Sequence, residues 1–139
     1  MANPLYDALL RPYIGAASPF LILPDGTHWS HDRFLRRSAQ FAHVLKTSGL
    51  APGSRLAVQV EKSPEALAVY AACVQAGVIF LPLNTGYTCT EIEYFIENSG
   101  AQMMLCDASA HANLKPITNQ YGAELLVLNA DGSGDFTKR

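Results

Sequence analysis

The sequence has little charge, few cysteines and no long apolar run, and each shortage excludes a class of protein. Only 16% of the 139 residues are charged and the formal net charge is −2. We therefore expect no binding to nucleic acid or to an anionic membrane. The apolar runs are much shorter than the ~20 residues that a membrane-spanning helix needs. With 49% hydrophobic residues, the chain is typical of a globular protein, and residues 1–139 fit a single domain or a subdomain of a larger one.

Cysteines are also scarce. Cys73, Cys89 and Cys106 are an odd number without CxxC spacing, so we expect neither a disulfide framework nor a zinc site. We expect these thiols to be buried and reduced, which is typical of a cytoplasmic protein. The N-terminus lacks the basic start of a signal peptide, and Pro12 interrupts its apolar run. We therefore predict a cytoplasmic location.

Several motifs of catalysis and phosphate binding are missing. The sequence contains no GxxxxGK[ST], no GxGxxG and no GxSxG pattern. His28 and His31 have HxxH spacing, but a hairpin that runs into a helix cap does not bring the two rings together reliably. We therefore predict no metal site and assign no catalytic residue within these residues.

What the sequence does contain is a regular alternation of helices and strands, marked by cap and turn residues. Ser63 followed by Pro64 begins a helix, and Gly77 ends it. Either Thr88 with Glu91 or Thr90 with Glu93 fits a capping box for the next helix. The expected helices are residues 5–10, 31–48, 64–76, 89–98 and 108–121, and the expected strands are 20–23, 28–29, 55–60, 78–81, 102–106 and 124–128.

These elements define an α/β fold. Strands that alternate with helices predict a mostly parallel sheet of three to four strands with helices on both faces, preceded by an N-terminal β-hairpin around Pro24-Asp25-Gly26. We expect Asp107 to cap the last helix and Pro116 to interrupt it. Residues 129–139 are interpreted as a polar tail, and the Arg36-Arg37 pair as a solvated helix face.

Ligands of open α/β sheets bind beyond the carboxyl ends of the strands, which here are residues 61–63, 83–85 and 107–109. Lys62, Ser63 and Asn84 are the candidates for cofactor binding. A lysine next to a Ser-capped helix start suits an anion, because a cation and free N–H groups converge there. The alternative is structural: Ser63 only caps its helix and Lys62 is solvated.

One family resemblance runs through the centre of the chain. Residues 75–84 read QAGVIFLPLN and residues 81–88 read LPLNTGYT. With these motifs, residues 61–107 resemble the adenylate-forming acyl-CoA synthetases, most closely the malonyl-CoA synthetases, and residues 27–58 support the match. The chain is similar to the beginning of that family's large N-terminal domain, so the fold would be an incomplete portion of a larger adenylate-forming domain.

The resemblance implies a two-step ligase. A small carboxylic acid, such as malonate, reacts with ATP in the presence of Mg²⁺ to give acyl-AMP and pyrophosphate, and coenzyme A then displaces AMP. In this family the phosphate loop and the catalytic lysine follow the matched region, so we expect the 139 residues to be inactive by themselves and to bind no cofactor alone.

Two alternatives stay open at this point. The chain could be a self-contained flavodoxin-like binding or interaction module without catalysis, or a structural half that complements a separate polypeptide. If later strands and helices are missing, an apolar face and an open sheet edge would be exposed, and we expect self-association through that face.

Overall fold

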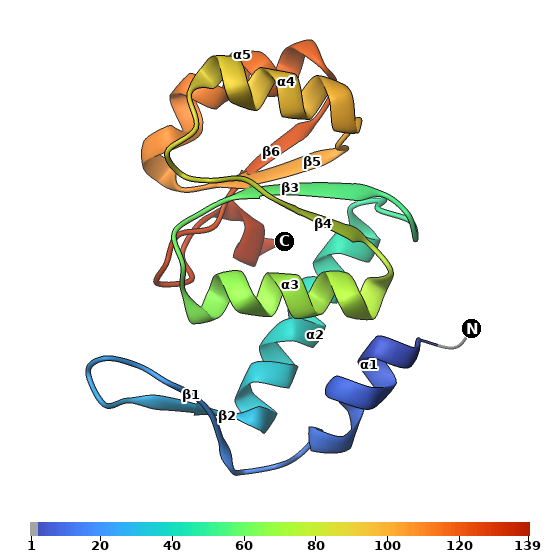
Figure 1. Ribbon diagram of the computed structural model, residues 1–139, viewed down its shortest axis with the longest axis vertical. Coiled ribbons are helices and arrows are strands. Elements are labelled where there is room, and N and C mark those ends of the chain that lie inside the picture. Colours follow the sequence, from blue (N-terminus) through green and yellow to red (C-terminus); the bar gives the residue numbers. More distant parts are fainter. Residues whose placement is uncertain (1–2) are drawn as a thin grey trace.

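A four-stranded parallel sheet between two helical layers organises the computed structural model, which describes residues 3–139 (Figure 1). The strands follow the order β4-β3-β5-β6. A separate antiparallel hairpin precedes them. The sheet strands are β3 (Arg55–Gln59), β4 (Ile79–Pro82), β5 (Met103–Cys106) and β6 (Glu124–Val127), and the hairpin strands are β1 (Pro19–Ile22) and β2 (His28–Ser30). The predicted α/β class, parallel sheet and hairpin are confirmed.

Helices cover both faces of this sheet, as predicted. The α-helices are α1 (Pro4–Leu9), α2 (His31–Thr47), α3 (Pro64–Ala76), α4 (Cys89–Ser99) and α5 (His111–Gln120), and the 3₁₀ turns are η1 (Arg11–Tyr13), η2 (Ala108–Ala110) and η3 (Asp135–Lys138). Helices α2 and α3 lie on one face, and α4 and α5 lie on the other (Figure 1). None of the helices in residues 3–139 is long and apolar enough to cross a membrane.

The strand order explains why the helices divide between the faces. The chain moves from β3 to β4 through α3, and then returns past β3 to β5 through α4. Because parallel crossovers are right-handed, two crossovers in opposite directions place their helices on opposite faces. The adjacent strands β3 and β5 therefore form a topological switch point, where ligands of open α/β sheets commonly bind.

Burial on both faces accounts for the apolar strands. Leu56 and Val58 of β3 pack into the core shared with α2 and α3, whereas Ala57 between them packs into the core shared with α4 and α5. All four residues of β5 are buried. Continuous apolar runs are expected of parallel strands covered on both sides, and they give this sheet two separate hydrophobic cores.

The helix caps follow the local sequence. The Ser63 hydroxyl accepts the Ala66 N–H at 3.1 Å, and Gly77 ends α3 with a left-handed φ of 74°. Thr88 and Glu91 form the complete capping box of α4, which decides between the two predicted boxes. These cap predictions are confirmed because each cap is satisfied by groups within three or four residues.

Two predictions about the segment after β5 are wrong. Pro116 lies in the middle of α5 and does not break it, because it removes only one internal hydrogen bond while the buried residues Leu114 and Thr118 on either side hold the helix against the core. Asp107 does occupy an N-cap position, that of η2 and not of α5, but its side chain makes no cap bond. The Ala108 N–H instead donates to Oδ1 of Asn129 at 2.9 Å, a partner brought from the end of β6.

The last residues pack against the body of the protein. We call residues 129–138 the C-terminal strap. Most of its side chains are polar, but Phe136 in η3 has no exposed surface, and its ring lies 5.1 Å from the ring of Phe41 on α2. The interpretation of residues 129–139 as a polar tail therefore omits an aromatic residue that completes the core beneath α2 and α3.

Candidate functional site

The candidate site is an open cavity at the carboxyl ends of β3 and β4, with a volume of about 820 Å³. Its floor is apolar and is contributed by Val58, Val60, Ala66, Phe80, Pro82 and Leu83. Its polar lining consists of Glu61, Lys62, Asn84, Thr85 and Tyr87. An apolar floor with a few polar groups is the usual composition of a small-molecule site.

The structure brings together two of the three predicted candidates. Lys62 and Asn84 come from the segments after β3 and β4, and both line this cavity. Ser63 does not line it, because its hydroxyl serves as the α3 cap. The exposed ammonium of Lys62 and amide of Asn84 suit an anionic or polar ligand, while Glu61 adds a carboxylate to the same lining. A role for Lys62 or Asn84 in ligand binding stays a prediction.

Sequence reasoning placed Thr85 at a strand end without making it a candidate, and it missed Tyr87. Both follow Asn84 in the loop after β4, and Tyr87 stacks on Phe95 of α4 with ring centroids 5.3 Å apart. The signal was present, because any polar residue that closely follows a parallel strand lies at the ligand edge of the sheet. The stacking that turns Tyr87 toward α4 could not be read from the sequence.

At the switch point between β3 and β5, Asp107 lies close to Glu61. Burial raises the pKa of the Asp107 carboxyl, the Glu61 backbone N–H opposes this, and the Glu61 charge adds to the rise. Within residues 3–139 there is no group of three His, Cys, Asp or Glu side chains that could hold a metal ion. This part of the sheet edge therefore presents two repelling carboxyl groups without the further ligands of a metal site.

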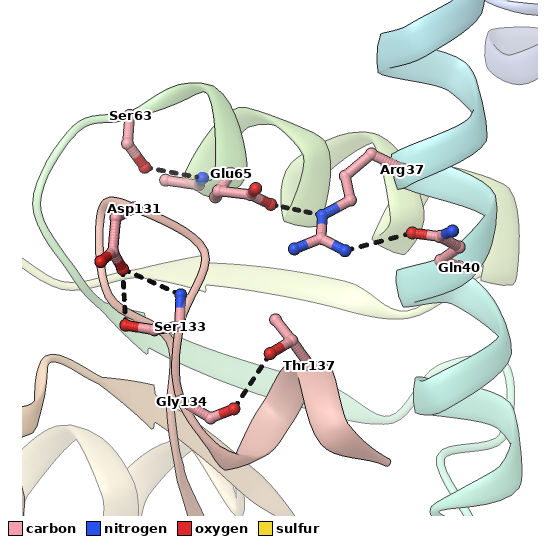
Figure 2. A network of polar contacts seen from close by, with 9 residues as sticks. Arg37, Gln40, Ser63, Glu65, Asp131, Ser133, Gly134 and Thr137 are labelled. Atoms are coloured by element: carbon pink, nitrogen blue, oxygen red, sulfur yellow. Dashed lines mark hydrogen bonds and ion pairs between the residues drawn. The ribbon is translucent and has the colours of Figure 1, made fainter.

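The other side of the switch point is covered by the C-terminal strap, which packs on an ion pair (Figure 2). Nε of Arg37 on α2 lies 2.7 Å from Oε2 of Glu65 on α3, and these side chains are only 26% and 9% exposed. The prediction that Arg37 is solvated is wrong, because α3 presents a carboxylate to it. Glu65 lies in the first turn of α3, where a negative charge also complements the helix dipole. A Cβ at Gly132 would lie 2.6 Å from Oε1 of Glu65, so the strap backbone contacts this pair directly.

The two buried cysteines, Cys73 and Cys106, supply no activated nucleophile. All three thiols are free, as expected. Burial raises the pKa of Cys73 and of Cys106 to about 12, which keeps both thiols protonated at neutral pH. Cys89 differs from the expectation of burial, because it begins α4 and is exposed.

The parallel sheet, the helices on both faces and the polar-lined cavity at its carboxyl edge define an α/β domain of the ligand-binding, doubly wound class. A family model described as AMP-binding enzyme matches residues 15–136. The chain belongs to this family of AMP-binding enzymes.

Solved structures agree with the family match. MatB from Rhodopseudomonas palustris in its apo form is 35% identical, with a TM-score of 0.91, over 99% of this chain and 28% of the MatB chain. The ATP-bound form of that protein is 36% identical, with a TM-score of 0.84, over 97% of this chain and 26% of its own. The predicted resemblance to adenylate-forming enzymes is confirmed.

Curated relatives have varied names. A feruloyl-CoA synthase of an Amycolatopsis species is 34% identical over 80 residues, which are 58% of this chain and 16% of that protein. Tyrocidine synthase 3 of Brevibacillus parabrevis is 33% identical over 98 residues, which are 68% of this chain and 1% of that protein. The chain thus spans a small part of the length of the relatives that it matches.

Proposed function

We propose that this chain is the first part of the large N-terminal domain of an AMP-forming acyl-CoA ligase of the malonyl-CoA synthetase type. The overall reaction would join malonate, ATP and coenzyme A to give malonyl-CoA, AMP and pyrophosphate. The observation that carries the proposal is the similarity to MatB, a malonyl-CoA synthetase, over 99% of the chain with a TM-score of 0.91. The LPLNTGYT segment at residues 81–88 supports the malonyl branch in particular.

ATP, Mg²⁺ and coenzyme A would be the cofactors and co-substrates of the whole enzyme. Residues 3–139 do not form a complete site for ATP with Mg²⁺. They contain none of the phosphate-loop patterns, and the part described, 3–139, holds no cluster of metal ligands. We therefore assign no reaction step to a residue of this chain. In our proposal the 139 residues are inactive by themselves and contribute the cavity beyond β3 and β4 to a larger site.

The test is a malonate-dependent assay on the protein encoded by the complete reading frame. AMP release would be measured with malonate, methylmalonate, acetate and hexanoate, each with and without coenzyme A. We expect the highest kcat/KM with malonate, and formation of malonyl-CoA only when coenzyme A is present. A preference for hexanoate or acetate would contradict the malonyl assignment while keeping the ligase class. AMP release by residues 1–139 would contradict the proposed division of the enzyme.

The proposal also includes a cytoplasmic location and self-association of the 139-residue chain. Self-association is supported by an apolar groove of about 280 Å³ between α1, β1 and α3, where Leu9, Phe20 and Tyr70 are exposed. Sedimentation at increasing concentration should show association of the wild-type chain, and Leu9→Ser should reduce it. A compact monomer at every concentration would contradict this part of the proposal.

A further inference from the structure

A buried glutamine lies at the carboxyl end of β3, next to the cavity. Gln59 is 7% exposed although its carboxamide is polar. Burying such a group is unfavourable unless it is hydrogen-bonded. Its Nε2 donates to the backbone oxygen of Asn84 at 3.0 Å, across 25 residues of sequence. The bond joins the central strand β3 to the loop that follows β4.

This contact differs from the others that shape the loop of residues 84–87. Oδ1 of Asn84 accepts the Gly86 N–H at 2.8 Å, and the Asn84 backbone oxygen accepts the Tyr87 N–H at 3.0 Å. These bonds are local, so they determine the internal shape of the turn and not its place relative to the sheet. The Leu83 N–H donates to Val58 O at 2.9 Å, which ends the ladder between β3 and β4 just before the loop. Beyond that point, Gln59 ties the loop back to β3.

We propose that Gln59 is a positioning residue of the cavity: its buried amide holds the loop of residues 84–87 against β3. Three residues of this loop, Asn84, Thr85 and Tyr87, line the cavity, as do Val58 of β3 and Val60 just after it. The Gln59 bond therefore sets the separation between the two walls. This inference deepens the proposed function, because it supplies the residue that shapes the cavity without itself lining it.

Amide hydrogen exchange in the 139-residue chain tests the positioning role of Gln59. Gln59→Leu keeps a similar volume and removes the donor. We expect the Gly86 and Tyr87 amides to exchange on the order of tenfold faster in this variant, as the loss of one buried hydrogen bond predicts, while the Met104 and Leu105 amides of β5 keep their protection. Gln102→Leu, at an exposed position before β5, is the control and should leave all four amides unchanged.

A second variant separates the hydrogen bond from simple packing. Gln59→Glu places a carboxylate against the Asn84 oxygen, so the loop should lose protection at pH 7. Protonating that carboxyl at low pH restores a donor, and the protection factors of Gly86 and Tyr87, corrected for intrinsic exchange, should recover. Gln59→Leu should show no recovery. Equal protection in wild type and Gln59→Leu, or failure of Gln59→Glu to respond to pH while β5 stays protected, would overturn the proposal.

Kinetics on the complete enzyme then connect the loop to substrate binding. KM values for ATP, coenzyme A and malonate would be compared in wild type, Gln59→Leu and Gln102→Leu. We expect a rise of about fivefold or more in at least one KM for Gln59→Leu only, with a smaller change in kcat. If Gln59→Leu releases the loop of residues 84–87 but leaves all three KM values unchanged, the proposed connection between this loop and the substrate site is overturned. A wild-type enzyme without ligase activity would refute the proposed function and leave the exchange result intact.

Discussion

The carboxyl edge of the sheet has two halves with different surroundings. Beyond β3 and β4 the edge opens into the cavity of about 820 Å³, where Lys62 and Asn84 are exposed. Beyond β5 and β6 it is covered by the C-terminal strap. There the Ala108 N–H donates to Asn129 and the Val127 N–H donates to Asp135 at 2.5 Å.

The two halves of the same sheet edge therefore have different roles. Backbone donors in the covered half are satisfied by side chains of the strap, so that half contributes to stability. The open half keeps exposed polar groups above an apolar floor, which is the arrangement that suits a ligand. Substitutions in the strap should therefore change stability, and substitutions near the cavity should change binding.

The largest effect is expected from Phe136→Ala. Removing a ring with no exposed surface from the core beneath α2 and α3 should cost about 3–5 kcal/mol of unfolding free energy. Urea denaturation would measure the loss. Phe20→Ala is the matched control: that ring is 40% exposed, and its loss should cost about 1 kcal/mol. Similar losses in the two variants would show that the strap is not part of the core.

Gly134→Ala should be the next most damaging change. A Cβ there would lie 2.1 Å from Val127 O, at a φ of 125° that side chains rarely adopt. We expect a loss of about 3 kcal/mol by urea denaturation. The control is Gly26→Ala, at a φ of 86° with open space around it, for which backbone strain predicts about 1 kcal/mol. The comparison isolates the close approach of the strap to β6, and an equal cost would argue against it.

Glu65→Gln should have an intermediate effect. It leaves Arg37 partly buried without its charged partner, and because Arg37 retains some exposure we expect a loss of about 2 kcal/mol. Asp32→Asn breaks the exposed pair with Arg36 at 2.9 Å and should cost about 0.5 kcal/mol or less. Chemical denaturation at low and high salt distinguishes them, because only the exposed pair should weaken with salt. An equal loss of unfolding free energy with equal salt dependence in the two variants would contradict this prediction.

The smallest effect concerns pH. Burial raises the pKa of Asp107, so the folded state holds this proton more tightly than the unfolded state. Its contribution to stability is therefore present below the ordinary pKa of aspartate and is lost as the pH rises through the raised, folded-state pKa. Asp107→Asn should remove this decrease of stability with rising pH, and the variant should be slightly more stable than wild type at pH 7.

Asp25 provides a control of opposite sign. The Thr27 hydroxyl, which donates to Asp25, lowers the pKa of that carboxyl. The contribution of Asp25 to stability is therefore present above the ordinary pKa of aspartate. It is lost as the pH falls through the lowered, folded-state pKa. Asp25→Asn should therefore remove a rise of stability with pH. Thermal melts between pH 3 and 8 would measure both, and the same slope change in the two variants would contradict the assignment.

Local signals account for most of what could be predicted. The Ser63 cap, the Thr88 box and the Gly77 stop are each completed within a few residues, so sequence spacing was sufficient to locate them. The expectation at Pro116 was wrong because a local rule for helix breaking competes with the packing of Leu114 and Thr118. Of the candidate site, the strand ends predicted Lys62 and Asn84, but not the shape of the cavity that they line.

The sequence by itself determined the elements, the α/β class and the family, because caps, turns and apolar runs act over one or two turns of chain and the LPLNTGYT motif is contiguous. Only the tertiary structure decided which half of the sheet edge is open. That outcome depends on contacts between distant residues, such as Arg37 with Glu65 and Gln59 with Asn84. Such pairs have no fixed spacing in a sequence, since the packing of the sheet and helices brings them together.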